Sequence, residues 1–346
     1  MMHSRWSSFL RKAGAHIKDG MAADFGNPGE ETRSAVGKHI LVDLSQFAII
    51  RITGKDAADF LHGQFTSNIH ALTATDLQSS SWCNPRGQVL ANFLLLKPDA
   101  GFLLLLPQDM KTYFMQGLQR YILRADVTLQ DESESLVRVG ISGPDLSQAM
   151  NTMPGSNQDP ARPIQHDKGI TLLPLPADKA RSILLGGVEA MQAAWHELAD
   201  GFRPAGAHCW ALLDILAGLP WITQATAAMF LPQMLNLDSL GGLSYQKGCY
   251  PGQEIITRLQ QRGQLKRKLC LARTQNGEAI QPGRHLFSRG DQRAVGTVIN
   301  IAPDPAGGHA MLAVVETAKT ESAEIIPEQQ DNSPLTFQPL PCPLHV

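Results

Sequence analysis

The sequence predicts a multidomain α+β protein that ends in a small antiparallel β-barrel. Its 346 residues, with 43% hydrophobic and 18% charged residues, suffice for a packed core and for more than one domain. Short β-rich runs alternate with helical patterns up to about residue 265. From Lys268 onward, short strands recur between Gly and Pro turns, which is typical of a small barrel.

Residues 1–37 show no hydrophobic periodicity and contain Gly and Pro, so we expect a poorly ordered N-terminal extension. Residues 1–18 are basic and contain no Asp or Glu. This weakly resembles an organelle presequence, although a frayed basic terminus is the simpler explanation. We therefore expect a cytoplasmic protein, with the mitochondrial matrix as the alternative.

Residues 38–265 form the predicted α+β region. Runs rich in β-branched residues predict strands at 39–43, 47–53, 136–141 and 183–185, and a β-meander over 82–106. Apolar periodicity predicts helices at 56–68, 109–123 and 189–198, and a further ordered segment at 210–215. Residues 151–163 are rich in Pro, Asn and Gly, and we interpret them as a loop inside a second domain.

Residues 266–320 form the predicted β-barrel, with strands at 269–273, 285–288, 294–301 and 311–315. Residues 321–346 are polar and rich in Pro, so we expect a loosely ordered tail. The longest apolar run, 102–106, is far too short to cross a bilayer.

Net charge and cysteine spacing exclude several classes of function. A net charge of −2 gives no global reason to expect binding to nucleic acid or to an anionic membrane. The cysteines are odd in number, widely spaced and without a Cys-x-x-Cys pair, which argues against a disulfide framework and a cysteine-based metal site. A reducing compartment follows. The five positions are Cys83, Cys209, Cys249, Cys270 and Cys342.

The segment 247–254 places a thiol, an amine, a phenol, an amide and a carboxylate around two glycines and a proline. The residues that follow predict a helix that begins near Pro251 or Gly252. Cys249 would then precede a helix N-terminus, where unpaired N–H groups and the helix dipole favour a thiolate. Lys247, two residues away, would also favour the thiolate and could bind a carboxylate, but a solvated lysine is equally consistent.

A structural explanation competes with each functional one. A cysteine is often a small buried hydrophobe, yet the flanking glycines and polar residues favour a nucleophilic or thiol-exchange role for Cys249. Tyr250 is either a ring partner for a ligand or a packing residue. Gln253 and Glu254 would lie in the first helical turn, where Glu254 is stabilised by the dipole and by Arg258 at i+4, or contacts a ligand.

The segment 247–254, followed by Arg258 and by Arg262 and Gly263, resembles the signature of the YgfZ folate-binding proteins. These are relatives of the glycine-cleavage T-protein, an aminomethyltransferase. Residues 60–66, 213–220 and 230–237 resemble further family segments, so that the resemblance covers about 40–320. The signature is highly specific, whereas the other segments alone would be weak.

This resemblance implies a T-protein-like fold with two α+β lobes and a C-terminal barrel around a central folate cavity. It also implies a protein that binds tetrahydrofolate, or another reduced folate, and supports the maturation or repair of iron–sulfur enzymes and thereby tRNA modification. Iron–sulfur client or assembly proteins would be its partners. The alternative is a folate-dependent one-carbon transferase or demethylase with Cys249 as nucleophile, and a third possibility is a pure interaction scaffold.

Two aromatic residues, Trp210 and Phe47, match folate-contacting positions of the family, and a flat pterin is a sensible partner for an aromatic face. We expect Trp210 to contact the folate. Phe47 stays a candidate, but its β-rich run fits core packing well. Trp82, Trp195 and Trp221 match no folate-contacting position. The implied site thus comprises Cys249 and Lys247 as reactive groups, with the folate contacts Trp210, Phe47, Tyr250, Gln253, Glu254 and Arg258.

The sequence departs from the T-protein pattern at one place. T-proteins share a Gly-Gly-x-x-Asp-Asp segment that supplies a carboxylate for folate chemistry, whereas the corresponding run here ends in Ala91 and Asn92. An amide cannot take a proton from a reacting amine. We therefore expect no ordinary aminomethyl transfer.

The stretch 255–268 holds cations and no acid. A solvated face is the usual explanation, and contact with the folate glutamate tail or with RNA is the functional one. This many charges suffice for a local anion site but not for general affinity for nucleic acid. The cations are Arg258, Arg262, Lys266, Arg267 and Lys268.

Overall fold

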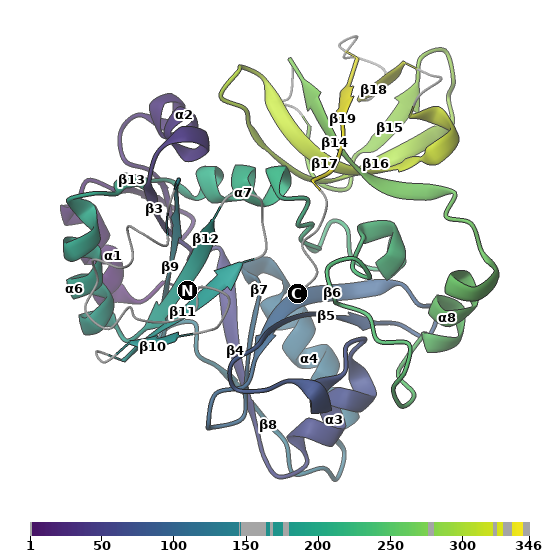
Figure 1. Ribbon diagram of the computed structural model, residues 1–346, viewed down its shortest axis with the longest axis horizontal. Helices are drawn as coiled ribbons and strands as arrows, with labels where there is room; N and C mark the ends of the chain where they lie inside the picture. The colour runs from purple at the N-terminus through teal and green to yellow at the C-terminus, as the bar shows by residue number, and fades with distance from the viewer. Residues whose placement is uncertain are drawn as a thin grey trace.

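The computed structural model describes residues 2–144, 146, 164–166, 169–175, 180–275, 280–320, 324–327 and 334–341. The predicted loop over 151–163 lies outside these residues. The α+β class is confirmed, because helices are interspersed among strands along the chain and the strands form three large sheets (Figure 1). No described helix combines the length and the apolar composition needed to cross a membrane.

The first large sheet is antiparallel, with the strand order β5-β6-β7-β4-β8. Successive side chains of β4 serve two cores: Ile50 and Ile52 pack with helices α3 and α4, whereas Phe47 and Ile49 belong to a core shared with the second sheet. The elements are β4 (Phe47–Thr53), α3 (Ala57–Gln64), β5 (Leu77–Cys83), β6 (Val89–Leu96), β7 (Phe102–Pro107), α4 (Lys111–Ile122) and β8 (Thr128–Asp131), with short 3-10 turns η1 (Ile69–Ala71) and η2 (Gln108–Met110).

The second sheet has the order β10-β11-β12-β9-β3-β13, in which β13 pairs with β3 in parallel. Residues of α1 and α6 pack in one of its cores and residues of α7 in the other. The elements are β3 (Ile40–Asp43), β9 (Val137–Ser142), β10 (Ile164–His166), β11 (Ile170–Leu175), β12 (Arg181–Gly186), α6 (Val188–Ala199), β13 (Arg203–Ala205) and α7 (Ala207–Leu216).

The N-terminal segment is ordered, so the expectation of a poorly ordered extension over 1–37 is wrong. Trp6 is 1% exposed, and its ring centroid lies 5.6 Å from that of Trp195. Its indole N–H donates a hydrogen bond to Oδ1 of Asp43 at 2.8 Å. These partners are distant in sequence, which is why no local pattern revealed them. The elements are α1 (Ser4–Lys12), β1 (His16–Lys18), β2 (Met21–Asp24) and α2 (Pro28–Gly37).

The third sheet is antiparallel, with the order β18-β15-β16-β17-β14-β19, and it curls above α7 in Figure 1. The four inner strands match the predicted barrel strands. The expected loose tail is wrong for 325–327 and 336–338, which form the two edge strands of this sheet. The elements are β14 (Arg267–Thr274), β15 (His285–Ser288), β16 (Ala294–Pro303), β17 (His309–Glu316), η4 (Thr317–Lys319), β18 (Ile325–Pro327) and β19 (Thr336–Gln338).

Helix α7 joins the sheets. Trp210 and Leu213 pack into the core shared by the first two sheets, whereas Leu212 and Ile215 pack into a core shared with the third sheet. A long segment with one 3-10 turn, η3 (Pro232–Leu235), leads from α7 to α8 (Gln253–Arg262).

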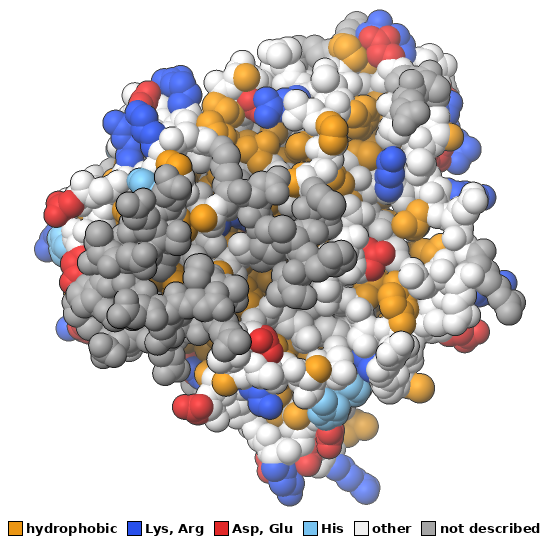
Figure 2. Space-filling model, viewed as in Figure 1, with side chains coloured by type: hydrophobic (Ala, Val, Ile, Leu, Met, Phe, Trp, Pro, Cys, Tyr) orange, Lys and Arg blue, Asp and Glu red, His pale blue; other side chains and the backbone are white. Residues whose placement is uncertain are grey.

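On the face shown in Figure 2, the described Lys and Arg side chains occur in separate groups.

Candidate functional site

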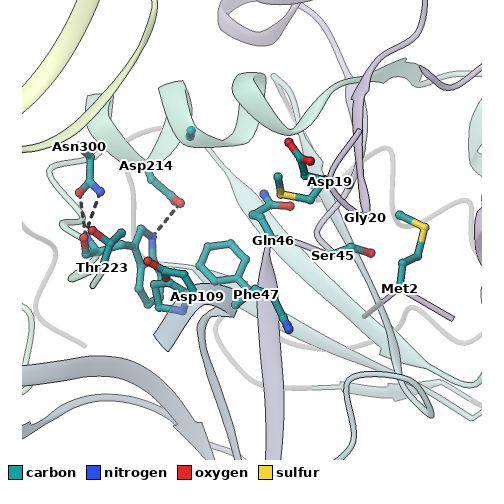
Figure 3. A pocket seen from close by; sticks show the side chains of 15 residues that line it. Met2, Asp19, Gly20, Ser45, Gln46, Phe47, Asp109, Asp214, Thr223 and Asn300 are labelled. Atoms are coloured by element: carbon teal, nitrogen blue, oxygen red, sulfur yellow. Dashed lines mark hydrogen bonds between the residues drawn. The ribbon is translucent and has the colours of Figure 1, made fainter. Parts of the chain in front are cut away.

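A cavity of about 790 Å³ lies where the first sheet, α7 and the third sheet meet. Figure 3 shows Phe47, Asp214 and Asn300 around it, each contributed by a different one of these elements. The N-terminal segment supplies a further part of the wall. The described lining residues are Met2, Asp19, Gly20, Met21, Ser45, Gln46, Phe47, Pro107, Gln108, Asp109, Ala211, Asp214, Trp221, Thr223 and Asn300.

Two aromatic rings form one wall of the cavity. The rings of Phe47 and Trp221 lie edge to face, with centroids 4.8 Å apart and an interplanar angle of 61°. Phe47 is the first residue of β4, and Trp221 follows Pro220 after the end of α7. Sequence comparison with the family did not select Trp221, which is thus a lining residue that sequence reasoning missed.

Three hydrogen bonds hold Trp221 in place. Its indole nitrogen donates to Oδ2 of Asp214 at 2.8 Å. Its backbone nitrogen donates to Oδ1 of Asn300 at 2.8 Å, and its carbonyl accepts from Nδ2 of the same Asn300 at 3.0 Å. Trp221 is therefore fixed from two directions, by α7 and by β16.

Asn92 fixes the residues on either side of Trp221. Its Nδ2 donates to the carbonyl of Pro220 at 2.8 Å, and its Oδ1 accepts from the backbone nitrogen of Ile222 at 2.8 Å. The side chain is 4% exposed. The Asn92 amide thus has a structural role, with both of its ends occupied.

The Asp214 carboxylate belongs to a buried ion pair. Nη1 of Arg181 donates to its Oδ1 at 2.7 Å, and both side chains are almost fully buried. Burial raises the pKa of Asp214, and the neighbouring Arg181 opposes that effect. Asp214 is the one acid in the mostly apolar helix α7, and this signal could have marked it as a functional candidate in the sequence.

Trp210, the predicted folate contact, does not line this cavity. Trp210 is 1% exposed and is not a lining residue, although its neighbour Ala211 is. Its ring fills the space above Gly140, where an added Cβ would lie 2.4 Å from the indole, and the Arg181 guanidinium lies 5.2 Å from the ring centroid. The helix turns Trp210 towards the second sheet and Ala211 and Asp214 towards the cavity.

The predicted start of the helix after Cys249 is confirmed. Helix α8 begins at Gln253, and its N-cap Gly252 has a φ of 82°. An added Cβ at Gly252 would lie 2.5 Å from Gly87 Cα, so that only glycine fits this contact.

Cys249 is exposed, whereas the other described cysteines, Cys83, Cys209 and Cys270, are buried. Burial raises the pKa of Cys83 and of Cys209 to about 12 and also raises that of Cys270. Among the described thiols, Cys249 is thus the one that a reagent or partner in solution reaches directly.

Lys247 ties the signature loop to the end of α3. Its ammonium donates to the carbonyls of His62, Phe65 and Ser67 at 2.5, 2.6 and 2.8 Å. Burial lowers the pKa of Lys247 to about 8. All three ammonium protons have partners, so this geometry supports a structural role, and the predicted effect on the Cys249 thiol stays a prediction.

The remaining signature residues divide between the core and the surface. Tyr250 is 6% exposed and packs in the core beside α7 and the third sheet, which favours the packing explanation. Gln253, Glu254 and Arg258 line a surface groove of about 470 Å³ together with Tyr245. Among the described ion pairs, none joins Glu254 to Arg258, so the expected i+4 pair does not form.

The structure therefore separates the predicted site residues into two groups. Phe47 lines the cavity, whereas no residue of 247–262 does. The expectation of a folate cavity with Cys249 at its mouth does not describe this cavity. The described part of the signature lies instead between α3 and the surface groove of α8.

Comparison with known proteins agrees with this fold. The family model described as the GCVT N-terminal domain matches residues 9–163. The crystal structure of the glycine cleavage system aminomethyltransferase T from Bartonella henselae superposes with a TM-score of 0.72 at 16% identity, covering 95% of this chain and 94% of that chain. The T-protein-like fold is thereby confirmed.

Two relatives share most of their length with this chain. The tRNA-modifying protein YgfZ of Klebsiella pneumoniae (strain 342) is 28% identical over 316 residues, 91% of this chain and 96% of the relative. The tRNA-modifying protein YgfZ of Colwellia psychrerythraea (strain 34H / ATCC BAA-681) is 30% identical over 243 residues, 70% of this chain and 73% of the relative. This chain belongs to the YgfZ family.

Proposed function

We propose that this protein binds tetrahydrofolate, or another reduced folate, in the cavity whose wall holds Phe47 and Trp221. As an accessory protein of the cytoplasm, it would support the maturation or repair of iron–sulfur enzymes and thereby tRNA modification. The observation that carries the folate assignment is the fixed aromatic pair beside the buried carboxylate of Asp214. The relatives named as tRNA-modifying proteins support the wider role.

The cavity offers a pterin ring both aromatic neighbours and hydrogen-bond acceptors. A flat ring packs favourably against aromatic side chains. Gln46 and Gln108 both line the cavity. Their side-chain oxygens are buried and accept no hydrogen bond from the described residues. A buried acceptor without a donor is costly. The N–H groups of a reduced pterin would supply the missing donors, and each Asp214 oxygen still has a lone pair free after its bond to Arg181 or Trp221.

The surface groove is the place we propose for the anionic part of a ligand or client. Arg258 presents a guanidinium there beside Gln253 and Glu254, and guanidinium groups bind carboxylates in a bidentate manner. Cys249 precedes the same helix, and we keep it as the reactive group towards an iron–sulfur client.

Ordinary aminomethyl transfer does not fit this site. Asn92 replaces the expected carboxylate, and both ends of its amide are bonded to backbone groups. The alternative function, a one-carbon transferase or demethylase that uses Cys249, draws support from the exposure of that thiol. A glycine-cleavage reconstitution and a turnover assay with labelled methylene- or methyl-tetrahydrofolate separate these activities from an accessory role, for which background rates are expected.

Calorimetric titration with tetrahydrofolate tests the ligand and its place together. Phe47→Ala and Asp214→Asn should weaken binding, while Trp210→Phe, a change in the core outside the cavity, should leave it unchanged. Failure of the wild type to bind would remove the folate assignment. A wild type that binds with unchanged affinity in Phe47→Ala and Asp214→Asn would move the folate elsewhere.

The accessory role is tested in a deletion strain by the activity of an iron–sulfur enzyme. Cys249→Ala should fold and still bind folate but should not restore that activity. Full restoration by Cys249→Ala would instead favour a scaffold that needs no reactive thiol.

A further inference from the structure

Three side chains with metal-binding atoms meet between α2 and the start of α7. Glu31 comes from α2, and His208 and Cys209 are neighbours in α7. One ligand atom from each lies within 4.8 Å of the others, and Nε2 of His208 is 3.3 Å from Sγ of Cys209. We propose that Glu31, His208 and Cys209 form a zinc-binding site.

The imidazole of His208 is oriented as in a metal ligand. Its Nδ1 lies 3.1 Å from the carbonyl of Ala23, which can only accept, so the ring proton belongs on Nδ1. In the neutral ring, which is the form that binds a metal, Nε2 then carries the lone pair. A backbone carbonyl that fixes the far nitrogen in this way is the usual outer partner of a metal-bound histidine. Around Nε2 lie Thr32 Oγ1 at 3.1 Å, Cys209 Sγ at 3.3 Å and the Pro28 carbonyl at 3.3 Å.

The hydroxyl of Thr32 leaves the lone pair of His208 free. Thr32 donates its proton to the Pro28 carbonyl at 2.7 Å, so it has none for Nε2. When the imidazole is neutral, the thiol of Cys209 remains as the donor to Nε2; when it is charged, Nε2 donates to the Pro28 carbonyl or to Thr32 instead. A metal ion would take the place of this thiol proton.

The cluster lacks positive charge. Glu31 is 3% exposed and Cys209 is fully buried. Glu31 accepts from the backbone nitrogens of Phe25, Asn27 and Gly206 at 2.8, 3.2 and 2.9 Å, and no described Lys or Arg pairs with it. A buried carboxylate without a cation is costly. A divalent cation would supply that charge, and an imidazolium is the competing source.

The donor set selects the metal. One thiolate, one imidazole and one carboxylate suit Zn²⁺, whereas Mg²⁺ and Ca²⁺ prefer oxygen ligands. In tetrahedral zinc sites a nitrogen and a sulfur ligand lie about 3.6 Å apart, close to the distance found here. Three protein ligands leave a fourth position, which water can reach because His208 is partly exposed.

Zinc at this place would join the N-terminal segment to the cavity wall. Ala23 and Glu31 belong to that segment, while Ala211 and Asp214, within two turns of the ligands on α7, line the cavity. Sequence spacing could not reveal the site, because the carboxylate lies far from the His-Cys pair in the chain and only the fold brings them together.

The test uses the full chain carrying Cys249→Ser and Cys342→Ser, so that neither the exposed thiol nor the C-terminal one competes. After treatment with EDTA, zinc is titrated in competition with a chromophoric chelator. One equivalent should bind, and the apparent affinity should rise about tenfold per pH unit above pH 7, because binding releases the thiol proton. Cobalt in place of zinc should give a thiolate-to-metal charge-transfer band.

The ligand variants then assign the site. Cys209→Ser and His208→Gln should each lose about tenfold or more in affinity, and zinc should raise the melting temperature of the parent but not of Cys209→Ser. Absence of the cobalt–thiolate band in the parent would overturn the proposal without any need for the ligand variants to fold. Persistence of the band in Cys209→Ser would overturn it as well.

Discussion

The indole nitrogen of Trp221 donates a 2.8 Å hydrogen bond to Oδ2 of Asp214, whose other oxygen holds Arg181. One carboxylate thus joins a buried cation of the second sheet to an aromatic ring of the cavity wall. The ring is therefore preorganised, and a ligand that stacks on it spends little free energy on ordering side chains.

Trp221→Ala should weaken tetrahydrofolate binding roughly five- to tenfold, because stacking adds on the order of 1 kcal/mol beyond buried area. It should also remove most of the ligand-induced quenching of tryptophan emission. Fluorescence titration checks both effects, with Trp210→Phe as the control that keeps its affinity. Quenching that persists in Trp221→Ala but vanishes in Trp210→Phe would restore the original assignment of Trp210.

Asn92→Asp should destabilise the fold by about 2–3 kcal/mol near neutral pH, because a carboxylate cannot donate to the Pro220 carbonyl and is buried there. Urea unfolding at pH 7 measures the loss. At low pH the introduced carboxyl is protonated and can donate, so the difference from wild type should shrink. An equal difference at both pH values would contradict this account of Asn92.

Cys249 should be alkylated before the other described cysteines under native conditions, because Cys83, Cys209 and Cys270 are buried and their thiol pKa values are raised. Mass spectrometry after limiting iodoacetamide identifies the labelled position. Early labelling of Cys83 or Cys270 would show that the packing around them opens more readily than the structure implies.

Lys247→Met should destabilise the protein by about 2 kcal/mol, because the carbonyls of His62, Phe65 and Ser67 lose their common donor. Urea unfolding provides the measurement, and Lys266→Met, an exposed-loop change in the same cationic stretch, provides the control. An unchanged midpoint for Lys247→Met would mean that the ammonium is not needed to hold the loop against α3.

Stability should fall as the pH drops below about 6.5, in part because of His62. Desolvation, with Lys247 and His70 nearby, lowers the pKa of His62, and its ring stacks on His70 with centroids 4.1 Å apart. The unfolded chain then binds protons first on acidification, which favours unfolding. Unfolding midpoints between pH 5 and 7.5 should vary less steeply in His62→Gln, and an identical slope would exclude this contribution.

Local pattern predicted the regular elements well. The β-branched run of β4 predicted a strand over 47–53, as observed, because enrichment in such residues favours an extended backbone locally. The glycine and proline of the signature likewise predicted a helix start near Pro251 or Gly252, and α8 begins at Gln253. Residues 1–37 were misjudged because their order depends on contacts such as that of Trp6 with Asp43, which no local pattern encodes.

The sequence by itself determined the family, the α+β class and the single signature that carries Cys249, because these depend on residue types at short spacing. Only the tertiary structure decided which tryptophan reaches the cavity. Trp210 turns to the core because Gly140 leaves room for its ring. Trp221 is held in the wall by Asn300, 79 residues away, and its neighbours by Asn92, about 130 residues away. Such contacts arise when distant segments pack together, and no spacing along the chain specifies them.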